Sequence, residues 1–377
     1  MNVLMICTEK LPVPPIHGGA IQTYIAGVAP ILAKEHQLTI LGRTDPALPI
    51  SNTEGNIRYE RVPSDGSLEK YSKKVADFLK EHSFDLIHIF NRPRLAPPVR
   101  EAAPNSRIVL SMHNDMFTPK KITPQIAETT IAEVEKIITV SDYVGRTIKT
   151  LYPQAGPKLR TIYSGVDLDR FKPCSSPKAQ KIRAELRKKH HLKGKKVLLF
   201  VGRLSPKKGA DILVQALQIL AKKGHEVALV LVGSKWYGQN RVTPYVAYVH
   251  ALSKRSAAPV ITTDFVHPEK VPHWYWAGDI FVCPSLWQEP LARVLYEAMA
   301  SGLPIVTTNR GGNPEVIKDK GLLVDSAEDP VSLSEKIAIL LNDDALCRRL
   351  GENGRAYAEA NSGWSRVARE ISEVWER

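Results

Sequence analysis

Short runs of apolar and β-branched residues alternate with longer segments of helical spacing, and the alternation occurs twice along the 377-residue chain. This pattern is typical of parallel sheets with helices on both faces. It therefore predicts an α/β fold with one sheet in each half of the chain. The predicted strands are VLMIC, QLTIL, DLIHIF, RIVLSMH and KIITVS in the first half, and KKVLLFVG, VALVLVG, PVITTDFV, DIFVCPS and PIVTTN in the second.

A domain boundary is predicted near TIYSGVDLDRFKP, residues 161–173, where a glycine and a proline interrupt the pattern. The predicted parts are residues 1–165, residues 166–361 and a C-terminal helix over residues 362–377, SGWSRVAREISEVWER. The two sheets are expected to face each other across a cleft. Ligands of open α/β sheets bind beyond the carboxyl ends of the strands. Functional residues are therefore expected in the loops at those ends.

The net charge of +13 is concentrated in residues 170–196, which contain eleven Lys or Arg residues and one acid, Glu185. The helical spacing of AQKIRAELRKKHHL favours a solvated helix face, with an anionic partner such as a membrane surface or polyphosphate as the alternative. Nucleic acid is not predicted as a partner, because no interleaved aromatic residues accompany the charge.

Two features of the sequence predict a cytoplasmic protein. The amino-terminal MNVLMICTEK has neither a basic leader nor a cleavage site, and no apolar run approaches the roughly 20 residues that span a bilayer. The cysteines are far apart and lack the spacing of a zinc site or a disulfide framework, so they are expected to be reduced. They are Cys7, Cys174, Cys283 and Cys347. The sequence leaves the oligomeric state open.

Two glutamates, Glu289 and Glu297, stand eight residues apart around the start of a predicted helix. Pro290 suits a first helical turn and Gly302 suits the position after the last one, so the helix is predicted over residues 290–301. Eight residues span about 12 Å along a helix axis. The catalytic carboxylates of a glycosidase are about 5 to 9.5 Å apart, so this pair is spaced instead to hold two ends of an extended ligand.

A phosphate site is predicted between the two glutamates. The backbone N–H groups at a helix N-terminus bind phosphate, and here they belong to Leu291, Ala292, Arg293 and Val294. Cations are supplied by FVGRLSPKKGADIL, in which Arg203 and Lys208 follow a strand and Gly209 allows a tight turn into the next helix. A nucleotide sugar has the matching layout of hydroxylated sugar, diphosphate and hydroxylated ribose.

These motifs resemble those of a known enzyme family. EPLARVLYE is similar to the E-x7-E motif of the retaining glycosyltransferases of family 4 (GT4), and GRLSPKKG is similar to their phosphate-binding loop. HGGA, SMHN, SGVD, AGDIFVCPS and GGNPEV extend the resemblance along the chain. It implies the GT-B architecture of two facing Rossmann-like domains with a C-terminal helix that crosses back to the first. EPLA replaces the family's usual EPFG and so removes a glycine at the turn that is expected to face the phosphate.

The resemblance assigns roles to residues of the second half. Glu289 is expected to bind hydroxyls of the donor sugar, and Glu297 those of the ribose. Arg203 and Lys208 are expected to neutralise the diphosphate. Val266 is expected to lie in the loop whose backbone contacts the base.

The resemblance also assigns roles in the first half. Gly18 and Gly19 are expected to bring the backbone close to the phosphates, although a simple loop turn also explains them. His113 is expected beside the donor sugar. Asn91 and Arg92 follow a strand and are candidates to contact the acceptor. Two further polar residues, Ser141 and Asp142, are explained by capping of a helix.

A metal site is not predicted. Asp167 and Asp169 have the D-x-D spacing by which other glycosyltransferases hold a divalent cation, but they lie in the hinge, away from the strand-end loops. The two cations in the phosphate loop already supply countercharge. No cofactor beyond the nucleotide-sugar donor, a UDP-, GDP- or ADP-sugar, is therefore expected.

The resemblance implies transfer of a sugar to a hydroxyl of a carbohydrate or other acceptor, with retention of configuration. A sugar-nucleotide epimerase is an alternative on the same architecture. Within the family, the segments TEKLPVPPIHGGAIQTYI, GSKWYG and WQEPLARVLYEAMASGLPIVTTNRGGNPEVI are most similar to the spore coat type. A structural component of the spore coat, with the transferase fold kept as a scaffold, is therefore a further alternative.

Overall fold

The computed structural model describes residues 1–235 and 242–376 of the chain. It divides into two compact units: unit 1 comprises Met1–Gly165 and Trp364–Arg377, and unit 2 comprises Val166–Gly363. The predicted division was after residues 165 and 361. The last three residues of the GSKWYG motif, 236–238, lie outside the described part of the chain, as does the final residue of the predicted C-terminal helix.

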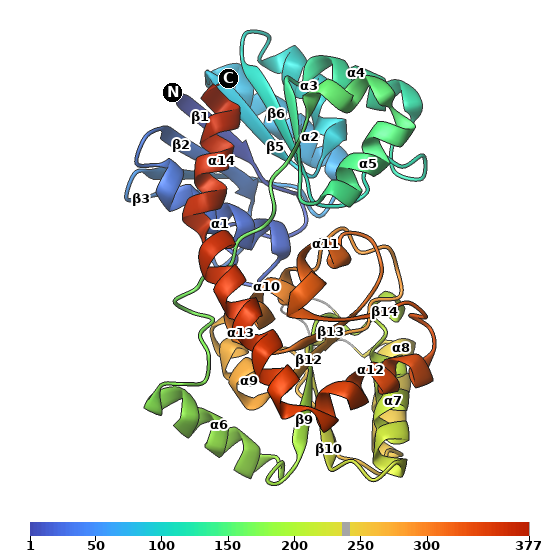
Figure 1. Cartoon of the computed structure of the whole chain (residues 1–377). Helices are drawn as coiled ribbons and strands as arrows, with labels where there is room; N and C mark the ends of the chain where they lie inside the picture. The colour runs from blue at the N-terminus through green and yellow to red at the C-terminus, as the bar shows by residue number, and fades with distance from the viewer. Residues whose placement is uncertain (236–241, 377) are drawn as a thin grey trace. The chain divides into compact units, whose positions relative to one another are not determined.

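Unit 1 is built on an eight-stranded sheet in the order β3-β4-β2-β1-β5-β6-β7-β8 (Figure 1). All neighbouring strands are parallel except β3 and β4, which form an antiparallel pair at one edge. The strands are β1 (Asn2–Ile6), β2 (Gln37–Arg43), β3 (Ser51–Glu54), β4 (Ile57–Val62), β5 (Leu86–Phe90), β6 (Arg107–Met112), β7 (Lys136–Thr139) and β8 (Leu159–Thr161). The prediction of an α/β fold is confirmed, although it omitted β3, β4 and β8.

The helices of unit 1 cover both faces of this sheet. In β1, Val3 and Met5 belong to the core that α1 and α14 complete, whereas the alternate residues Leu4 and Ile6 are buried on the opposite face. Across the described residues the helices are α1 (Ala20–Leu32), α2 (Leu68–Glu81), α3 (Ala96–Ala102), α4 (Pro124–Glu133), α5 (Asp142–Leu151) and α14 (Trp364–Glu376), with short 3-10 turns η1 (Pro93–Leu95) and η2 (Pro153–Lys158). Capping by Ser141 is confirmed, because its Oγ accepts the N–H of Val144.

The C-terminal helix α14 is part of unit 1 although it is distant in sequence. Its apolar side, which includes Ile371 and Trp375, is fully buried in the core with α1. The Trp364 ring occupies the space in which a Cβ on Gly27 or Gly165 would lie, so both positions require glycine. The helix α14 therefore completes the unit 1 core, although all of unit 2 lies between them in the sequence.

Unit 2 contains a six-stranded parallel sheet in the order β11-β10-β9-β12-β13-β14. Its strands are β9 (Lys196–Val201), β10 (Val227–Val232), β11 (Val260–Thr262), β12 (Ile280–Cys283), β13 (Ile305–Thr308) and β14 (Gly321–Val324). Across the described residues its helices are α6 (Pro177–Lys189), α7 (Ala210–Lys222), α8 (Pro244–Lys254), α9 (Val271–Ala277), α10 (Arg293–Ala300), α11 (Asn313–Ile317), α12 (Pro330–Asn342) and α13 (Asp344–Asn361), with 3-10 turns η3 (Pro206–Lys208), η4 (Pro268–Lys270) and η5 (Lys318–Lys320). The strand β14 was not predicted.

No helix in the described parts of either unit has the length and apolar character needed to cross a membrane.

The basic segment 170–196 includes α6, which was predicted to be a solvated helix. This prediction holds only in part, because Arg183 and Arg187 both turn toward Asp279. The Arg187 guanidinium also donates to the carbonyl oxygen of Ala277, at the end of α9. Two of the basic residues therefore fasten α6 to the sheet, while lysines such as Lys181 and Lys188 remain exposed.

Candidate active site

Three loops of unit 2 meet at the carboxyl ends of adjacent strands. The strands β9, β12 and β13 are neighbours, so the loops that follow them lie side by side. Gly209 (φ 67°) and Gly311 (φ 60°) hold these loops in close contact: a Cβ on the first would overlap the carbonyl oxygen of Pro284, and one on the second would overlap that of Glu289. Only glycine fits this backbone conformation and spacing.

Glu289 lies at the centre of these loops, and its side chain is only 8% exposed. Its Oε2 accepts three hydrogen bonds, from Lys208 Nζ at 2.6 Å, Trp287 Nε1 at 2.8 Å and Ser285 Oγ at 2.9 Å. Among residues 1–235 and 242–376, no hydrogen-bond partner contacts its Oε1. One oxygen is thus saturated by the protein and the other retains its capacity to accept a hydrogen bond.

The Glu289 carboxyl is held in its charged form. Burial alone raises its pKa, but the adjacent ammonium and the three hydrogen bonds outweigh burial, so the pKa lies below the ordinary 4.5. The site therefore presents a carboxylate at neutral pH.

Lys208 makes this ion pair from the turn η3, and its side chain is 18% exposed. Its Nζ lies 5.9 Å from the centre of the Trp287 ring, and the Nζ of Lys207 lies 4.8 Å from the same ring. A π face attracts cations, so the indole gathers both ammonium groups at one place. Lys208 and Glu289 were predicted to contact different parts of a ligand, and the structure brings them into contact with each other.

The helix α10 begins later than predicted. It runs from Arg293 to Ala300 and not from residue 290, and Ala292 precedes it with extended backbone. The Ala292 N–H was expected to face a phosphate but donates to Asn313 Oδ1 at 3.0 Å. Proline is compatible with extended backbone as well as with a first helical turn, so Pro290 does not fix the start. The position predicted for Gly302 after the helix is confirmed by its φ of 72°.

Glu297 lies on α10 with its side chain 15% exposed. Its Oε2 accepts the hydroxyl of Tyr275 at 2.9 Å, and its Oε1 lies 3.8 Å from a guanidinium nitrogen of Arg293. Burial, followed by the charge of Glu297, raises the pKa of Tyr275, so the phenol stays protonated and donates. The second glutamate is therefore also held in position by neighbouring side chains.

The other unit 2 candidates lie at the same edge of the sheet. Arg203 is half-buried in the loop after β9, and Val266 is half-buried in the loop after β11. The Asp167 carboxylate, which was not predicted to be a metal ligand, accepts the backbone N–H groups of Asp169 and Arg170, both at 3.0 Å. It stabilises the turn that follows the hinge.

In unit 1, the predicted residues also follow strands that are neighbours, β1, β5 and β6. Gly18 and Gly19 have φ values of 88° and 113° and lead into α1. His113 follows β6, where its backbone N–H donates to Asn91 Oδ1 at 3.0 Å and its ring lies 4.7 Å from that of Tyr24. Asn91 itself has a left-handed backbone, with a φ of 54°.

A buried ion pair lies beside Asn91. Arg92 donates from Nε to Glu9 Oε2 at 2.6 Å and from a terminal nitrogen to Glu9 Oε1 at 3.0 Å. The side chains are 11% and 3% exposed. Arg92 also donates to the Asn91 carbonyl oxygen at 2.7 Å. The ion pair therefore fixes Asn91, whose side chain in turn binds the His113 backbone N–H. Arg92 was predicted to contact an acceptor, and in the structure its guanidinium is occupied by Glu9.

Sequence reasoning missed several residues that shape these sites: Glu9, Tyr275, Ser285, Trp287 and Asn313. Glu9 and Trp287 had a usable signal, because each stands in a loop immediately after a predicted strand. Asn313 had none, since its contact with Ala292 depends on the approach of the loops after β12 and β13.

Solved glycosyltransferases share this fold. Sucrose-phosphate synthase from Thermosynechococcus elongatus matches with a TM-score of 0.81 and 21% identity, covering 100% of this chain and 98% of that one. Anabaena Alr3699/HepE in complex with UDP and glucose matches with a TM-score of 0.77 and 21% identity, covering 100% and 99%. The fold is therefore the GT-B class, with two Rossmann-like domains.

The sequence defines the family within that class. The model described as Glycosyltransferase Family 4 matches residues 18–170, and the model described as Glycosyl transferases group 1 matches residues 182–357. Spore coat protein SA of Bacillus subtilis (strain 168) is 44% identical over 379 residues, covering 100% of both chains. The chain belongs to the glycosyltransferases of group 1 and family 4.

Proposed function

We propose that this glycosyltransferase moves a sugar from a nucleotide-diphosphate sugar to a hydroxyl of an acceptor, with retention of configuration and without a required metal ion. The observation that carries the proposal is the charged Glu289 carboxylate, which has one oxygen saturated by Lys208 and two neighbours and the other oxygen without a partner in the described chain. A sugar hydroxyl is a donor that suits that oxygen.

Lys208 supplies the charge that the leaving group needs. Its ammonium is paired with Glu289 and is 18% exposed, so a diphosphate oxygen can share it without breaking the pair. Arg203, in the same loop, adds a second cation. These two charges support a reaction without a metal, and the engagement of Asp167 in a backbone turn agrees with this.

The remaining contacts to the nucleotide sugar are proposed on α10 and in nearby loops. Glu297 is proposed to bind the ribose hydroxyls, and the backbone N–H groups of Leu291 and Val294 to bind the phosphates, with Ala292 committed to Asn313. Val266 is proposed to lie beside the base. In unit 1, the family resemblance supports a role for Gly18, Gly19 and His113 in donor binding.

The chemistry requires no nucleophile from the protein. The acceptor oxygen bonds to the anomeric carbon on the face from which the nucleotide leaves, the bond from that carbon to the diphosphate oxygen breaks, and the acceptor proton passes to the departing phosphate. The protein orients the two reactants and stabilises the negative charge that grows on the diphosphate. Retention rests on the resemblance of EPLARVLYE to the E-x7-E motif.

A thermal-shift panel of UDP, GDP, ADP and their sugars tests donor binding. A ligand that binds only the folded state raises the melting temperature. HepE, which shares the fold, binds UDP and glucose, so UDP is the first member of the panel. We expect one nucleotide series to stabilise the chain, and product analysis to show sugar transferred to an acceptor. Release of an isomerised nucleotide sugar would identify an epimerase instead, and no shift with any member would contradict the proposal.

A structural role in the spore coat is the second candidate, favoured by the 44% identity to a protein named Spore coat protein SA. The two roles differ in one measurable respect: a scaffold has no need to bind nucleotides. Stabilisation by a nucleotide sugar in the purified protein, together with localisation to the cytoplasm, would support the enzyme. Localisation to the coat without any nucleotide binding would support the scaffold.

A further inference from the structure

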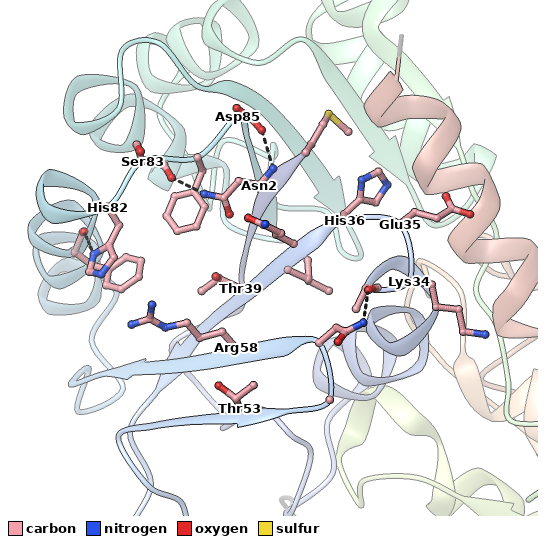
Figure 2. Close-up of a pocket in the computed structure, with 18 of the residues that line it drawn as sticks. Asn2, Lys34, Glu35, His36, Thr39, Thr53, Arg58, His82, Ser83 and Asp85 are labelled. Atoms are coloured by element: carbon pink, nitrogen blue, oxygen red, sulfur yellow. Dashed lines mark hydrogen bonds between the residues drawn. The ribbon is translucent and has the colours of Figure 1, made fainter.

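A pocket lies in unit 1 at the amino-terminal edge of its sheet, opposite to the strand ends that carry His113 and Asn91. It has a volume of about 1100 Å³ and is lined where β1, β2 and β4 begin and where the chain approaches β5 (Figure 2). Asn2 begins β1, and Arg58 is near the start of β4. His113 and Asn91 follow the carboxyl ends of their strands, so this pocket is separate from the candidate site of unit 1.

One wall of the pocket is a stack of aromatic rings. The His82 ring lies 4.2 Å from that of Phe78 at an interplanar angle of 15°, and the Phe78 and Phe84 rings are 6.2 Å apart at 24°. His82 Nδ1 lies 2.9 Å from the Phe78 carbonyl oxygen. A carbonyl oxygen only accepts, so Nδ1 carries the proton and in the neutral ring Nε2 is an acceptor. The ring is thereby fixed in orientation and offers a flat π face with an acceptor at its edge.

Polar groups line the same space (Figure 2). Asn2 donates its side-chain N–H to the Ser83 carbonyl oxygen at 2.8 Å, which leaves its Oδ1 as an acceptor. Within residues 1–235 and 242–376, the Thr39 hydroxyl makes no hydrogen bond, and Arg58 uses its Nε for Glu60 and keeps its terminal nitrogens. Donors and acceptors are thus both present beside the aromatic wall.

The charges around the pocket decide which ligand it suits. Two cationic side chains, Lys34 and Arg58, and three anionic ones, Glu35, Glu81 and Asp85, line it. A phosphate or polyanion requires an excess of positive charge, which this lining lacks. Asp85 accepts the Asn2 backbone N–H at 2.7 Å. Of the lining carboxylates, Glu35 alone lies close to other possible metal ligands in the described chain, His36 and Glu376, and both glutamates of that group are exposed. A neutral ligand with both hydroxyl groups and apolar faces matches the mixture. The volume of about 1100 Å³ is slightly above the range of about 300–1,000 Å³ typical of small-molecule sites, which suits a ligand of several sugar units.

We propose that this pocket binds a neutral oligosaccharide, with the C–H face of a sugar ring on His82 and hydroxyl groups on Asn2, Thr39 and Arg58. It is a binding site at the other end of the unit 1 strands from His113 and Asn91, and it holds a glycan chain on the protein. The proposal does not depend on which donor unit 2 binds, or on whether the chain transfers a sugar at all.

Native affinity electrophoresis of the full chain tests the proposal, with dextran, mannan or soluble amylopectin as the probe in the gel. We expect at least one of these neutral polysaccharides to retard the protein, and retardation to persist in 0.5 M salt because the ligand is uncharged. His82→Ala should weaken binding about tenfold, the scale of a lost aromatic contact. Thr39→Val, which removes a hydroxyl at nearly constant volume, should also weaken it.

Two control variants separate binding in this pocket from binding elsewhere on the protein. Tyr248→Ala removes an aromatic ring that is 49% exposed in unit 2, and should leave retardation unchanged. Lys208→Ala should reduce the thermal shift by nucleotide sugars and leave retardation unchanged, so failure of the donor site and failure of the pocket are separable. The proposal is overturned if no neutral polysaccharide retards the protein, if only polyphosphate does, or if His82→Ala and Tyr248→Ala bind equally.

Discussion

Each unit of this glycosyltransferase contains an ion pair in the loops at the carboxyl edge of its sheet, and the two pairs differ in how they are satisfied. In unit 1, Arg92 contacts both carboxylate oxygens of Glu9, and both side chains are nearly buried. In unit 2, Lys208 contacts one oxygen of Glu289, which also takes two further hydrogen bonds. Both carboxylate oxygens of Glu9 are therefore engaged by Arg92, whereas Oε1 of Glu289 has no hydrogen-bond partner in the described part of the chain.

The chemistry of the two cations accounts for this difference. A guanidinium matches a carboxylate with two parallel hydrogen bonds and is therefore suited to fixing a backbone, as Arg92 does through the Asn91 carbonyl. An ammonium is a point charge with three donors, and it can serve a carboxylate and a phosphate together. We infer that the unit 1 pair positions its loop and that the unit 2 pair binds ligand.

Arg92→Ala should have the largest effect. It removes both hydrogen bonds of Arg92 to the buried Glu9 carboxylate and leaves only the half-exposed Lys10 ammonium, 3.4 Å from Oε1, beside it. Removal of one partner of a buried ion pair typically costs about 3–5 kcal/mol of folding free energy, and Lys10 should keep the cost toward the lower end. Urea unfolding followed by hydrogen exchange in peptides of unit 1 measures this cost. Arg94→Ala removes the same charge from an exposed position two residues away and should cost little. Equal stability of the two variants would show that the Glu9–Arg92 pair is not structural.

Lys208→Ala should chiefly affect transfer. Loss of one preorganised charge that stabilises a leaving group lowers kcat about 10²–10³-fold. The measurement is the initial transfer rate with the donor that the thermal-shift panel identifies. Lys207→Ala is the matched control, because it removes the neighbouring ammonium, which contacts the Trp287 ring and not Glu289. An equal loss in both variants would mean that general positive charge, and not the ion pair, supports the reaction.

Gly311→Ala should lower the folding stability by an intermediate amount. The new Cβ would overlap the carbonyl oxygen of Glu289, and the φ of 60° is strained for alanine, so we expect a cost of about 1–3 kcal/mol. Gly194→Ala has a similar φ of 77° but no atom within 4 Å of its Cβ. The difference between the melting temperatures of the two variants therefore isolates the clash. No difference would show that the loops after β12 and β13 separate easily.

The sequence predicted the strands that a local pattern of apolar residues reveals. Strands such as β9 and β10 are continuous apolar runs, and they were found because a parallel strand is buried on both faces. The strand β4 alternates buried and exposed residues, and β3 is largely exposed. Both depend on pairing at a sheet edge with partners that no local pattern specifies, and both were missed.

The candidate site followed the same division. Motif spacing selected Glu289, Glu297 and Lys208 as candidates, because those residues stand in segments with a recognisable pattern. It could not predict that Lys208 and Glu289 contact each other, since they are 81 residues apart and meet only through strand order. It also misplaced the start of α10, where the Ala292 N–H donates to Asn313 on the loop after β13, a contact between distant segments that local spacing does not specify.

Glu289→Gln should produce the smallest effect, in the dependence of stability on pH. The pKa of Glu289 is lower in the folded protein than the ordinary 4.5, so its charge stabilises the fold above that pH and the contribution is lost as the pH falls through the folded pKa. The neutral glutamine has no such contribution, so the difference in melting temperature between the variant and the wild type should narrow as the pH falls from 6 to below 4.5. This change should be smaller than the fall in melting temperature that Gly311→Ala causes. Glu335→Gln, at an exposed position on α12, should not narrow the gap in this way. If the melting temperatures of Glu289→Gln and the wild type change in parallel with pH, Lys208 does not hold this carboxylate in its charged form. The contrast between the two ion pairs would then rest only on how many carboxylate oxygens each cation contacts.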